Sequence, residues 1–228
     1  MRGVTKISQK VSLLKKMVEL LHYFGDDNMI CDVARVSFDK EASSYTKEQN
    51  NKLIEYLAKH NHWSPFSHPQ LQFRIKCPIY VERQLVKSEA GRVYNSVSGR
   101  YVDFSDTYTT INGWREQSKS SKQGSDGLLD NQNDCNRIEQ EIIEHCKSAY
   151  KKLIKFGVSK EQARTILPLN LNTTMIWTGS FYTFIRVCNQ RLKLDAQQET
   201  REIAQQMLDL VKNINSNPFE HALKAFGY

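Results

Sequence analysis

Residues 68–78 read HPQLQFRIKCP, and this stretch decides the character of the fold. Its apolar residues recur at every second position and would share one face: Leu71, Phe73, Ile75 and Cys77. That period is typical of a half-buried strand. Pro78 ends the strand, and proline is well tolerated in the first turn of a helix. The pattern therefore predicts a strand followed by a helix over residues 79–87, which Gly91 interrupts.

Helical patterns lie on both sides of this strand. Residues 46–60 place apolar side chains at helical spacing, and Thr46 with Gln49 resembles a capping box. Further helices are predicted over residues 138–157, 159–168, 173–191 and 196–213. The third of these is expected to be buried, and the last to be amphipathic. Together the elements indicate an α+β fold, in which an antiparallel or mixed sheet is flanked by helices.

A polar segment interrupts this pattern between residues 118 and 134. It reads SKSSKQGSDGLLDNQND and is rich in Ser, Asn, Asp and Gly. Such composition predicts a long mobile loop. We expect one domain over residues 1–228 with a flexible flap at about 114–134, although the segment also resembles a domain linker.

Composition limits the kind of protein. Apolar residues make up 39% of the 228 residues and charged residues 25%, which is typical of a soluble globular chain. Residues 1–10 lack the features of a secretory signal, so a cytoplasmic protein is expected, in the host cytoplasm if the source is viral. Five cysteines without C-x-x-C spacing indicate reduced thiols. The net charge of +7 favours anionic partners, either nucleic acid or small phosphorylated ligands.

Residues 83–101 concentrate the groups that bind phosphate. They read RQLVKSEAGRVYNSVSGRY, in which arginine and lysine alternate with Gln, Ser and Asn. Guanidinium groups hold phosphate through paired hydrogen bonds, and hydroxyls and backbone N–H groups complete such a site. A solvated basic helix and turn has the same composition, and composition alone favours that simpler interpretation.

A resemblance to a known family favours the phosphate-binding interpretation of residues 83–101 over the solvated helix and turn. The sequence NSVSGRY at residues 95–101, preceded by Arg83-Gln84, resembles the signature of flavin-dependent thymidylate synthases. Four further segments resemble the family's motifs in the same order: residues 34–38, 62–68, 163–170 and 191–199. These segments extend from Ala34 to Glu199, which is most of the chain.

The resemblance implies a reaction, its cofactors and an assembly. The implied reaction converts dUMP to dTMP, with methylenetetrahydrofolate as the one-carbon donor and FAD, reduced by NADPH, as the hydride source. Members of the family are homotetramers whose active sites combine residues of several subunits. Neither a nucleic acid nor a membrane is implied as a partner.

The resemblance also implies a role for individual residues. Arg191 would be the catalytic residue and would polarise the uracil ring. The residues that would contact dUMP are Gln84, Lys87, Ser96, Ser98, Gly99, Arg100, Arg164 and Arg191. The residues that would contact FAD are Ser37, His62, Ser64, Lys87, Ser88, Glu89, Asn95, Ser180 and Arg186.

Several positions depart from the family's pattern. Most members carry Arg-His-Arg where this chain has Lys87-Ser88-Glu89. Lys87 keeps a positive charge but cannot form the paired hydrogen bonds of an arginine, and Glu89 reverses the charge. Serine replaces the usual glutamate at two positions and the usual asparagine at a third, and an aspartate replaces a histidine: Ser67, Ser96, Ser180 and Asp195. A flavoprotein that lacks synthase activity is therefore an alternative.

Other interpretations of these residues are less favoured. His60, His62 and His68 have spacing that can bind zinc, but no cysteine or carboxylate completes a ligand set, so no metal is expected. Cys77 is expected to be a buried, unreactive thiol. Trp63, Phe66 and Trp177 are expected in the core.

The principal alternative function is a basic nucleic-acid-binding protein. Against it, few aromatic residues are expected to be exposed among the basic ones, although single-strand binders stack bases on such rings.

Overall fold

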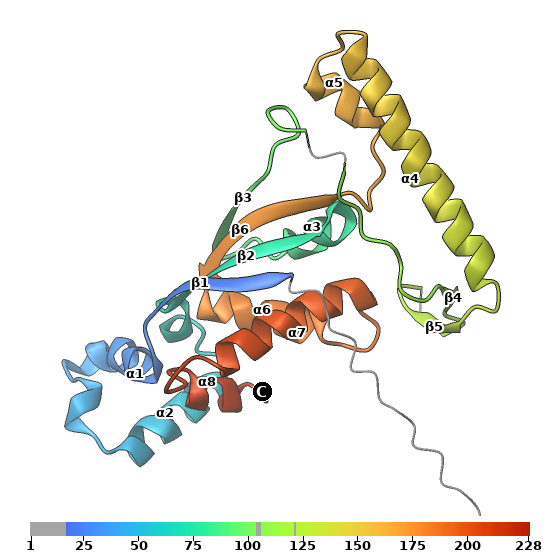
Figure 1. The fold of residues 1–228 in the computed structure, drawn as a ribbon. Coiled ribbons are helices and arrows are strands. Elements are labelled where there is room, and N and C mark those ends of the chain that lie inside the picture. The colour runs from blue at the N-terminus through green and yellow to red at the C-terminus, as the bar shows by residue number, and fades with distance from the viewer. Residues whose placement is uncertain (1–16, 104–105, 121) are drawn as a thin grey trace, which may run out of the picture.

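A four-stranded antiparallel sheet forms the centre of the molecule (Figure 1). The computed structural model describes residues 17–103, 106–120 and 122–228. In spatial order the strands are β1 (Val18–Phe24), β2 (Gln70–Pro78), β6 (Asn172–Ser180) and β3 (Arg92–Ser96). The predicted α+β class with an antiparallel sheet is confirmed.

The pairing of β2 with β6 fixes which side chains enter the core. Phe73 lies opposite Trp177 across nine paired positions, and both side chains are buried. Leu71, Ile75 and Cys77 share the buried face of β2, as the alternation predicts. The other face of β2 is polar, and β6 adds two threonines and Ile176 to it; there Gln72 Nε2 donates to Thr178 Oγ1 at 2.9 Å.

Helices cover the apolar face of the sheet (Figure 1). They are α6 (Phe181–Arg191), α7 (Gln198–Lys212) and, at the far end of β2, α3 (Ile79–Leu85). The ring of Phe184 stacks on Phe73 with centroids 6.1 Å apart. The predicted amphipathic helix at residues 196–213 is confirmed as α7, whose inward face includes Ile203 and Met207.

Three helices form one end of the molecule: α1 (Asp27–Arg35), α2 (Lys47–Lys59) and α8 (Glu220–Ala225). The expected capping box begins α2, because Thr46 Oγ1 accepts from Gln49 N and the Gln49 side chain accepts from Thr46 N. Short 3-10 turns complete this end at residues 36–38, 42–44 and 65–67.

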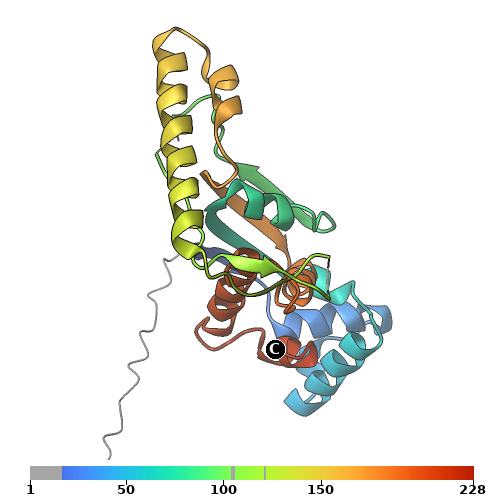
Figure 2. The same ribbon diagram turned by 90° about the vertical axis from the view of Figure 1, so that its right-hand side faces the viewer.

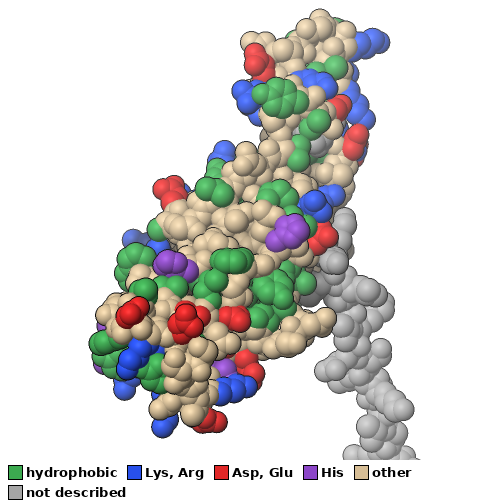
Figure 3. Space-filling view, turned by 90° about the vertical axis from the view of Figure 1, so that its left-hand side faces the viewer, with side chains coloured by type: hydrophobic (Ala, Val, Ile, Leu, Met, Phe, Trp, Pro, Cys, Tyr) green, Lys and Arg blue, Asp and Glu red, His purple; other side chains and the backbone are tan. Residues whose placement is uncertain are grey.

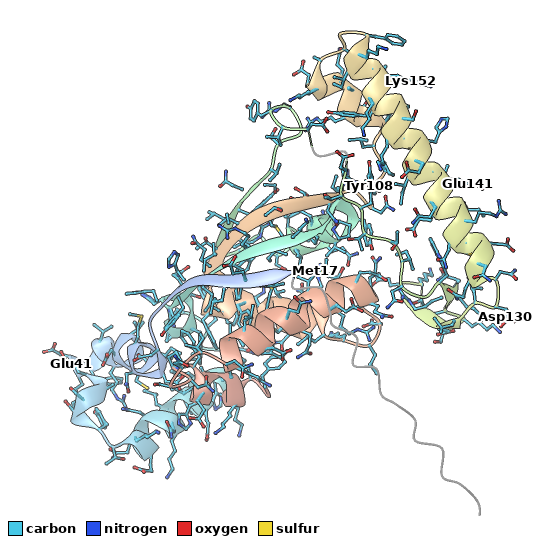
Figure 4. All side chains as sticks on the ribbon, viewed as in Figure 1. Met17, Glu41, Tyr108, Asp130, Glu141 and Lys152 are labelled. Atoms are coloured by element: carbon cyan, nitrogen blue, oxygen red, sulfur yellow. The ribbon has the colours of Figure 1, made fainter. Side chains whose placement is uncertain are left out.

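A long arm extends from the other end of the sheet (Figures 1 and 2). The arm comprises α4 (Gln132–Lys155), α5 (Lys160–Ala163) and the 3-10 turn Arg164–Ile166. Figure 4 shows Tyr108 near the base of the arm, and Glu141 and Lys152 along α4. A small hairpin of β4 (Arg115–Gln117) and β5 (Ser125–Leu128) lies beside the start of α4.

Several predictions about local structure are wrong. Residues 173–191 do not form one helix, because residues 172–180 form strand β6 and only the remainder is helical. The strand is favoured by its β-branched and aromatic residues and by partners on both edges. The segment predicted as a loop at 118–134 contains β5 and the first turn of α4.

The exposure of some apolar residues also differs from expectation. Ile138 and Ile142, apolar residues on one stripe of the arm helix, are 55% and 53% exposed. Trp63, expected in the core with Phe66 and Trp177, is exposed, whereas the other two are buried. Tyr94 and Tyr101 are exposed among the basic residues, with Arg92 and Arg100 over their rings. None of the helices within the described ranges has the length and hydropathy needed to cross a membrane.

Candidate functional site

The end of helix α6 brings together residues that are far apart in sequence. Arg191 Nη2 donates to the backbone oxygen of Gln84, at the end of α3, at 2.6 Å. The Gln84 side chain in turn donates to Gln197 Oε1 at 2.5 Å, just before α7 begins. Three helix ends therefore meet at this cluster. It places a guanidinium group next to two amide side chains.

Arg191 is partly withdrawn from water. Burial lowers the pKa of its guanidinium group below the ordinary arginine value. Its Nε is buried and has no hydrogen-bond partner among the described residues. A buried donor without a partner is costly, so an acceptor supplied by a ligand would stabilise this group.

The turn at residues 86–91 lies against α6. Ser88 is buried, with its Oγ 3.5 Å from Gln190 Oε1, whereas Lys87 and Glu89 are exposed. Gly91 has a φ of +76°, and a Cβ there would lie 2.5 Å from Thr183 Oγ1. Only glycine fits such a position without a shift of its neighbours.

Ser180, one of the expected flavin contacts, lies at the start of α6. Its side chain is buried and accepts a hydrogen bond from the Thr183 backbone N–H at 3.2 Å. This contact caps the helix. In a single chain the hydroxyl of Ser180 is thus engaged in local structure.

A hollow of about 340 Å³ gathers three of the residues expected to bind flavin. Ser37, His62 and Ser64 line it together, although Ser37 follows α1 and the other two follow α2. Trp63 also lines the hollow, and its ring lies 6.1 Å from that of Tyr182 on α6. The hollow therefore adjoins the start of α6.

The exposed face of α6 connects this hollow to the Arg191 cluster. Tyr182, Arg186 and Gln190 follow one another at intervals of four residues, so they lie along one face of the helix. Eight residues of helix extend about 12 Å. Trp63 contacts the first of these side chains, and Ser88 contacts the last. We call this face, from the hollow to Ser88, the α6 track.

The signature loop after β3 forms a third group. Ser98 Oγ accepts from the backbone N–H of Arg100 at 3.3 Å, and Gly99 is buried. Lys160 Nζ on the arm donates to the Tyr101 backbone oxygen at 3.2 Å, which joins this loop to α5. Arg164, four residues further along, is exposed. The guanidinium groups of Arg100 and Arg164 are thus both available on this side.

The register of β3 separates two neighbouring residues. Asn95 pairs with Ile176 and so lies on the polar face of the sheet, whereas Ser96 pairs with Met175 on the face that the helices cover. Ser96 Oγ donates to Glu82 Oε1 on α3. Asn95 consequently lies on the sheet face opposite the α6 track. One chain does not bring it together with Ser37, His62 and Ser64.

Sequence reasoning missed the residues that connect these groups. Tyr182 and Gln190 had no assigned role, although they are spaced at four-residue intervals from Arg186 and this signal was available. Gln197 belongs to a motif segment, but only the fold shows that it contacts Gln84.

His60 and His62 lie in a local packing contact, and Cys77 is buried. No cluster of three or more His, Cys, Asp or Glu residues able to hold a metal ion occurs in the described ranges. The rings of His60 and His62 pack on each other with centroids 6.4 Å apart. Burial raises the pKa of the Cys77 thiol to about 12, which agrees with the predicted unreactive thiol.

Comparison with known proteins supports the resemblance found in the sequence. A family model described as "Thymidylate synthase complementing protein" matches residues 19–215. The flavin-dependent thymidylate synthase of Kosmotoga olearia is 36% identical over 88% of this chain and 87% of its own length. The chain belongs to the flavin-dependent thymidylate synthase family.

A second relative and a solved structure also match the chain over most of its length. The flavin-dependent thymidylate synthase of Thermus thermophilus is 34% identical over 87% of this chain and 72% of its own length. Among solved structures, a UMP/dUMP methylase, PolB, from Streptomyces cacaoi bound with 5-Br dUMP matches with a TM-score of 0.82. That match covers 92% of this chain and 93% of the other at 23% identity, and it supports the fold.

Proposed function

We propose that this chain is a flavin-dependent thymidylate synthase that methylates dUMP to dTMP. The observation that carries the proposal is the Arg191 cluster, in which a half-buried guanidinium with an unpartnered Nε lies beside Gln84 and Gln197. In a chain of this family, a partly desolvated arginine with amide neighbours suits the uracil ring. The amides can donate to and accept from its edge, as nucleobase recognition requires.

The arginines have different tasks in this proposal. Arg191 holds the uracil and stabilises the negative charge that develops on the ring, and its reduced contact with water strengthens this effect. Arg100 and Arg164, which are exposed beside Ser98, suit the phosphate of the nucleotide because guanidinium groups bind phosphate through paired hydrogen bonds. The geometry thus provides different groups for the base and for the phosphate.

The α6 track fits an extended cofactor such as FAD. Ser37, His62 and Ser64 lie at one end of it, Arg186 in the middle, and Ser88 at the other end. The aromatic rings of Trp63 and Tyr182 provide apolar surface next to these polar groups. When bound, FAD supplies the hydride that completes the methyl group. The protein's contribution is to position the two ligands and to exclude water.

We also propose NADPH and methylenetetrahydrofolate as co-substrates, the first as the reductant and the second as the one-carbon donor. Both are anionic, which suits a chain whose net charge is +7.

The proposed assembly is a homotetramer with shared active sites. Three observations support it. The hollow of about 340 Å³ is at the small end of ligand sites, so it can hold only part of a dinucleotide. Asn95 lies on the opposite sheet face from the α6 track. The arm leaves Ile138 and Ile142 more than half exposed, and exposed apolar side chains of this kind are typical of an interface. A second copy completes both the site and the packing.

The purified protein tests the proposal directly. It should be yellow, with a flavin absorption spectrum, and it should form dTMP from dUMP when NADPH and methylenetetrahydrofolate are present. A colourless protein that binds DNA or RNA with steep salt dependence would instead be a nucleic-acid-binding protein. A yellow protein whose reduced flavin is not oxidised in a dUMP-dependent way would be a flavoprotein without synthase activity.

A further inference from the structure

The β4–β5 hairpin, residues 115–128, has no role in the function proposed above, yet one of its side chains is held firmly. Arg115 donates from three nitrogens to residues outside its own strand. Its Nε donates to Ser125 Oγ on β5 at 3.0 Å, and its Nη1 donates to Gln198 Oε1 at 3.0 Å. Its Nη2 forms an ion pair with Glu199 Oε1 at 2.8 Å. Arg115 therefore joins both strands of the hairpin to the first turn of α7.

The Arg115–Glu199 ion pair is shielded from water. Its side chains are 16% and 13% exposed, the lowest values for an ion pair in the described part of the chain. The pair Arg74–Glu19 has the same length of 2.8 Å, but its side chains are 52% and 48% exposed. Shielding strengthens the attraction and makes the loss of one partner costly, because the other charge stays buried. The two pairs are thus matched in geometry and differ in surroundings.

Glu199 depends on Arg115 for its hydrogen bonds. The second carboxylate oxygen of Glu199 is buried without a partner among the described residues, and so is the hydroxyl of Tyr80. Burial raises the pKa of the Tyr80 hydroxyl, and the charge of Glu199 adds to this effect. Without Arg115, Glu199 would keep an uncompensated charge, and the start of α7 would have to move to hydrate it.

The start of α7 is also the support of the Arg191 cluster. Gln197 precedes the helix, and its Oε1 accepts from Gln84 Nε2 at 2.5 Å. The backbone oxygen of Gln84 accepts from Arg191 at 2.6 Å. A shift of Gln197 would therefore move Gln84 and remove a constraint on Arg191. Arg115 lies outside the cluster but contacts Gln198 and Glu199, the two residues that follow Gln197.

We propose that Arg115 is a positioning residue for the nucleotide site: through Glu199 and Gln197 it holds Gln84 and Arg191 in the arrangement that dUMP requires. The hairpin is then part of the framework of the active site. This inference rests on the proposed function, because it takes Gln84 and Arg191 to be nucleotide contacts.

The experiment compares steady-state kinetics of Arg115→Gln with those of the wild-type chain. We expect the KM for dUMP to rise about tenfold in Arg115→Gln, the usual size of coupling between linked groups, while kcat falls less. The matched control Arg74→Gln removes an ion pair of the same length and should leave KM unchanged. Arg115→Lys, which keeps the charge but not the forked geometry, should show an intermediate KM.

A second variant separates positioning from simple stability. Arg115→Gln combined with Glu199→Gln removes the uncompensated charge, so the double variant should melt closer to the wild type than Arg115→Gln does. Its KM for dUMP should stay raised, because the link to Gln197 is still broken. A KM equal to that of the wild type in this double variant, or in Arg115→Gln, overturns the inference. If Arg115→Gln does not fold, the double variant and Arg115→Lys decide by the same criterion.

The wild-type chain in the same assay distinguishes the two possible failures. Absence of flavin or of dTMP formation in the wild type means that the proposed function is wrong. An active wild type combined with an unchanged KM in these variants means that only the role of Arg115 is wrong.

Discussion

The sheet region, with its covering helices, buries its apolar side chains more completely than the arm does. In the sheet, Phe73 contacts both Trp177 and Phe184, and all three side chains are enclosed by their own chain. In the arm, Ile143 and Tyr150 are the buried residues of the 24-residue helix α4, while Ile138 and Ile142 are more than half exposed. Figure 3 shows hydrophobic side chains next to lysine and arginine on the surface of the arm.

This difference in burial indicates how firmly each region holds its part of the candidate site. The sheet region holds Arg191 and Gln84 rigidly, because three helix ends converge on them. The arm holds Arg164, beside a loop that carries Arg100, on a support with little packing of its own. In the proposed function, the base-binding part is therefore fixed within the chain, whereas the phosphate-binding part is expected to gain its support from another copy.

The largest expected effect is that of Arg191→Ala, in the sheet region. We expect kcat to fall by about 100-fold to 1000-fold, the loss typical of one preorganised donor. The melting temperature should change little, because the side chain makes one hydrogen bond to the protein and is only partly buried. Measurement of kcat and of thermal unfolding on the same sample checks both parts. Near-normal turnover in this variant would remove Arg191 from the catalytic role.

Mixing two inactive variants would sharpen the comparison. Subunits with Arg191→Ala and subunits with Arg164→Ala, unfolded and refolded together, should regain roughly a quarter of the wild-type activity if each site takes the two arginines from different chains. Half of the sites would receive an intact Arg191, and half of these an intact Arg164. Each variant refolded alone is the control. A mixture no more active than these controls would mean that both arginines serve one site from the same chain.

A pair of identical substitutions compares the packing of the two regions. Ile185→Ala, at a fully buried position of α6, should reduce the free energy of unfolding by about 3 kcal/mol, as is usual for such cavities. Ile142→Ala, on the arm, should change it by less than about 0.5 kcal/mol in the isolated chain. Urea unfolding at low protein concentration measures both.

Association provides the second half of that test. Ile142→Ala should raise the concentration at which the assembly dissociates in sedimentation experiments, whereas a polar surface variant on α8 such as Lys224→Gln, whose side chain is 62% exposed, should not. Equal losses of unfolding free energy in Ile185→Ala and Ile142→Ala would show that Ile142 packs within its own chain.

The last comparison concerns the thiols, which divide between the same two regions and have no expected effect at neutral pH. Cys77 in the sheet is buried, whereas Cys135 and Cys146 on α4 are partly exposed. At pH 8 a thiol reagent should label the two arm cysteines first. Because burial raises the Cys77 pKa from 9.0 to about 12, the unfolded chain loses this proton first as pH rises. Stability should thus decline above pH 9, by at most about 1.4 kcal/mol per unit for this thiol.

The Cys77→Ala variant is the control for the pH dependence. It should show a shallower decline of unfolding free energy between pH 9 and pH 11 than the wild type, whatever its stability at pH 7. Parallel declines would show that other groups cause the loss.

Local signals in the sequence predicted part of the fold. Strand β2 has a strict period of two and a proline at its end, and helix α2 has a capping box, so short-range patterns suffice for both. Strand β6 has apolar or β-branched side chains on both faces, a pattern that short buried strands share with buried helices. Its identity depends on β2 and β3, which are distant in sequence.

The candidate site also depends on contacts between residues that are distant in sequence. The motifs indicated Arg191 and Gln84 separately, but their contact spans 107 residues and depends on how three helices end. The placement of Asn95 depends on the register of β3, which a shift of one residue would reverse. Sequence patterns therefore identify the groups, whereas their division between two faces of the sheet requires the fold.

The pairing of β3 with β6 has a consequence for how the chain folds. Ser96 at the end of β3 lies opposite Met175 in β6, so the chain leaves the sheet and returns to its neighbouring strand after roughly 80 residues that include the arm. Closing so long a loop costs only ~2 kcal/mol more than closing a short turn. The sheet can thus assemble before the arm has acquired its structure. The arm region is free to vary in length without disturbing the order in which the central strands meet.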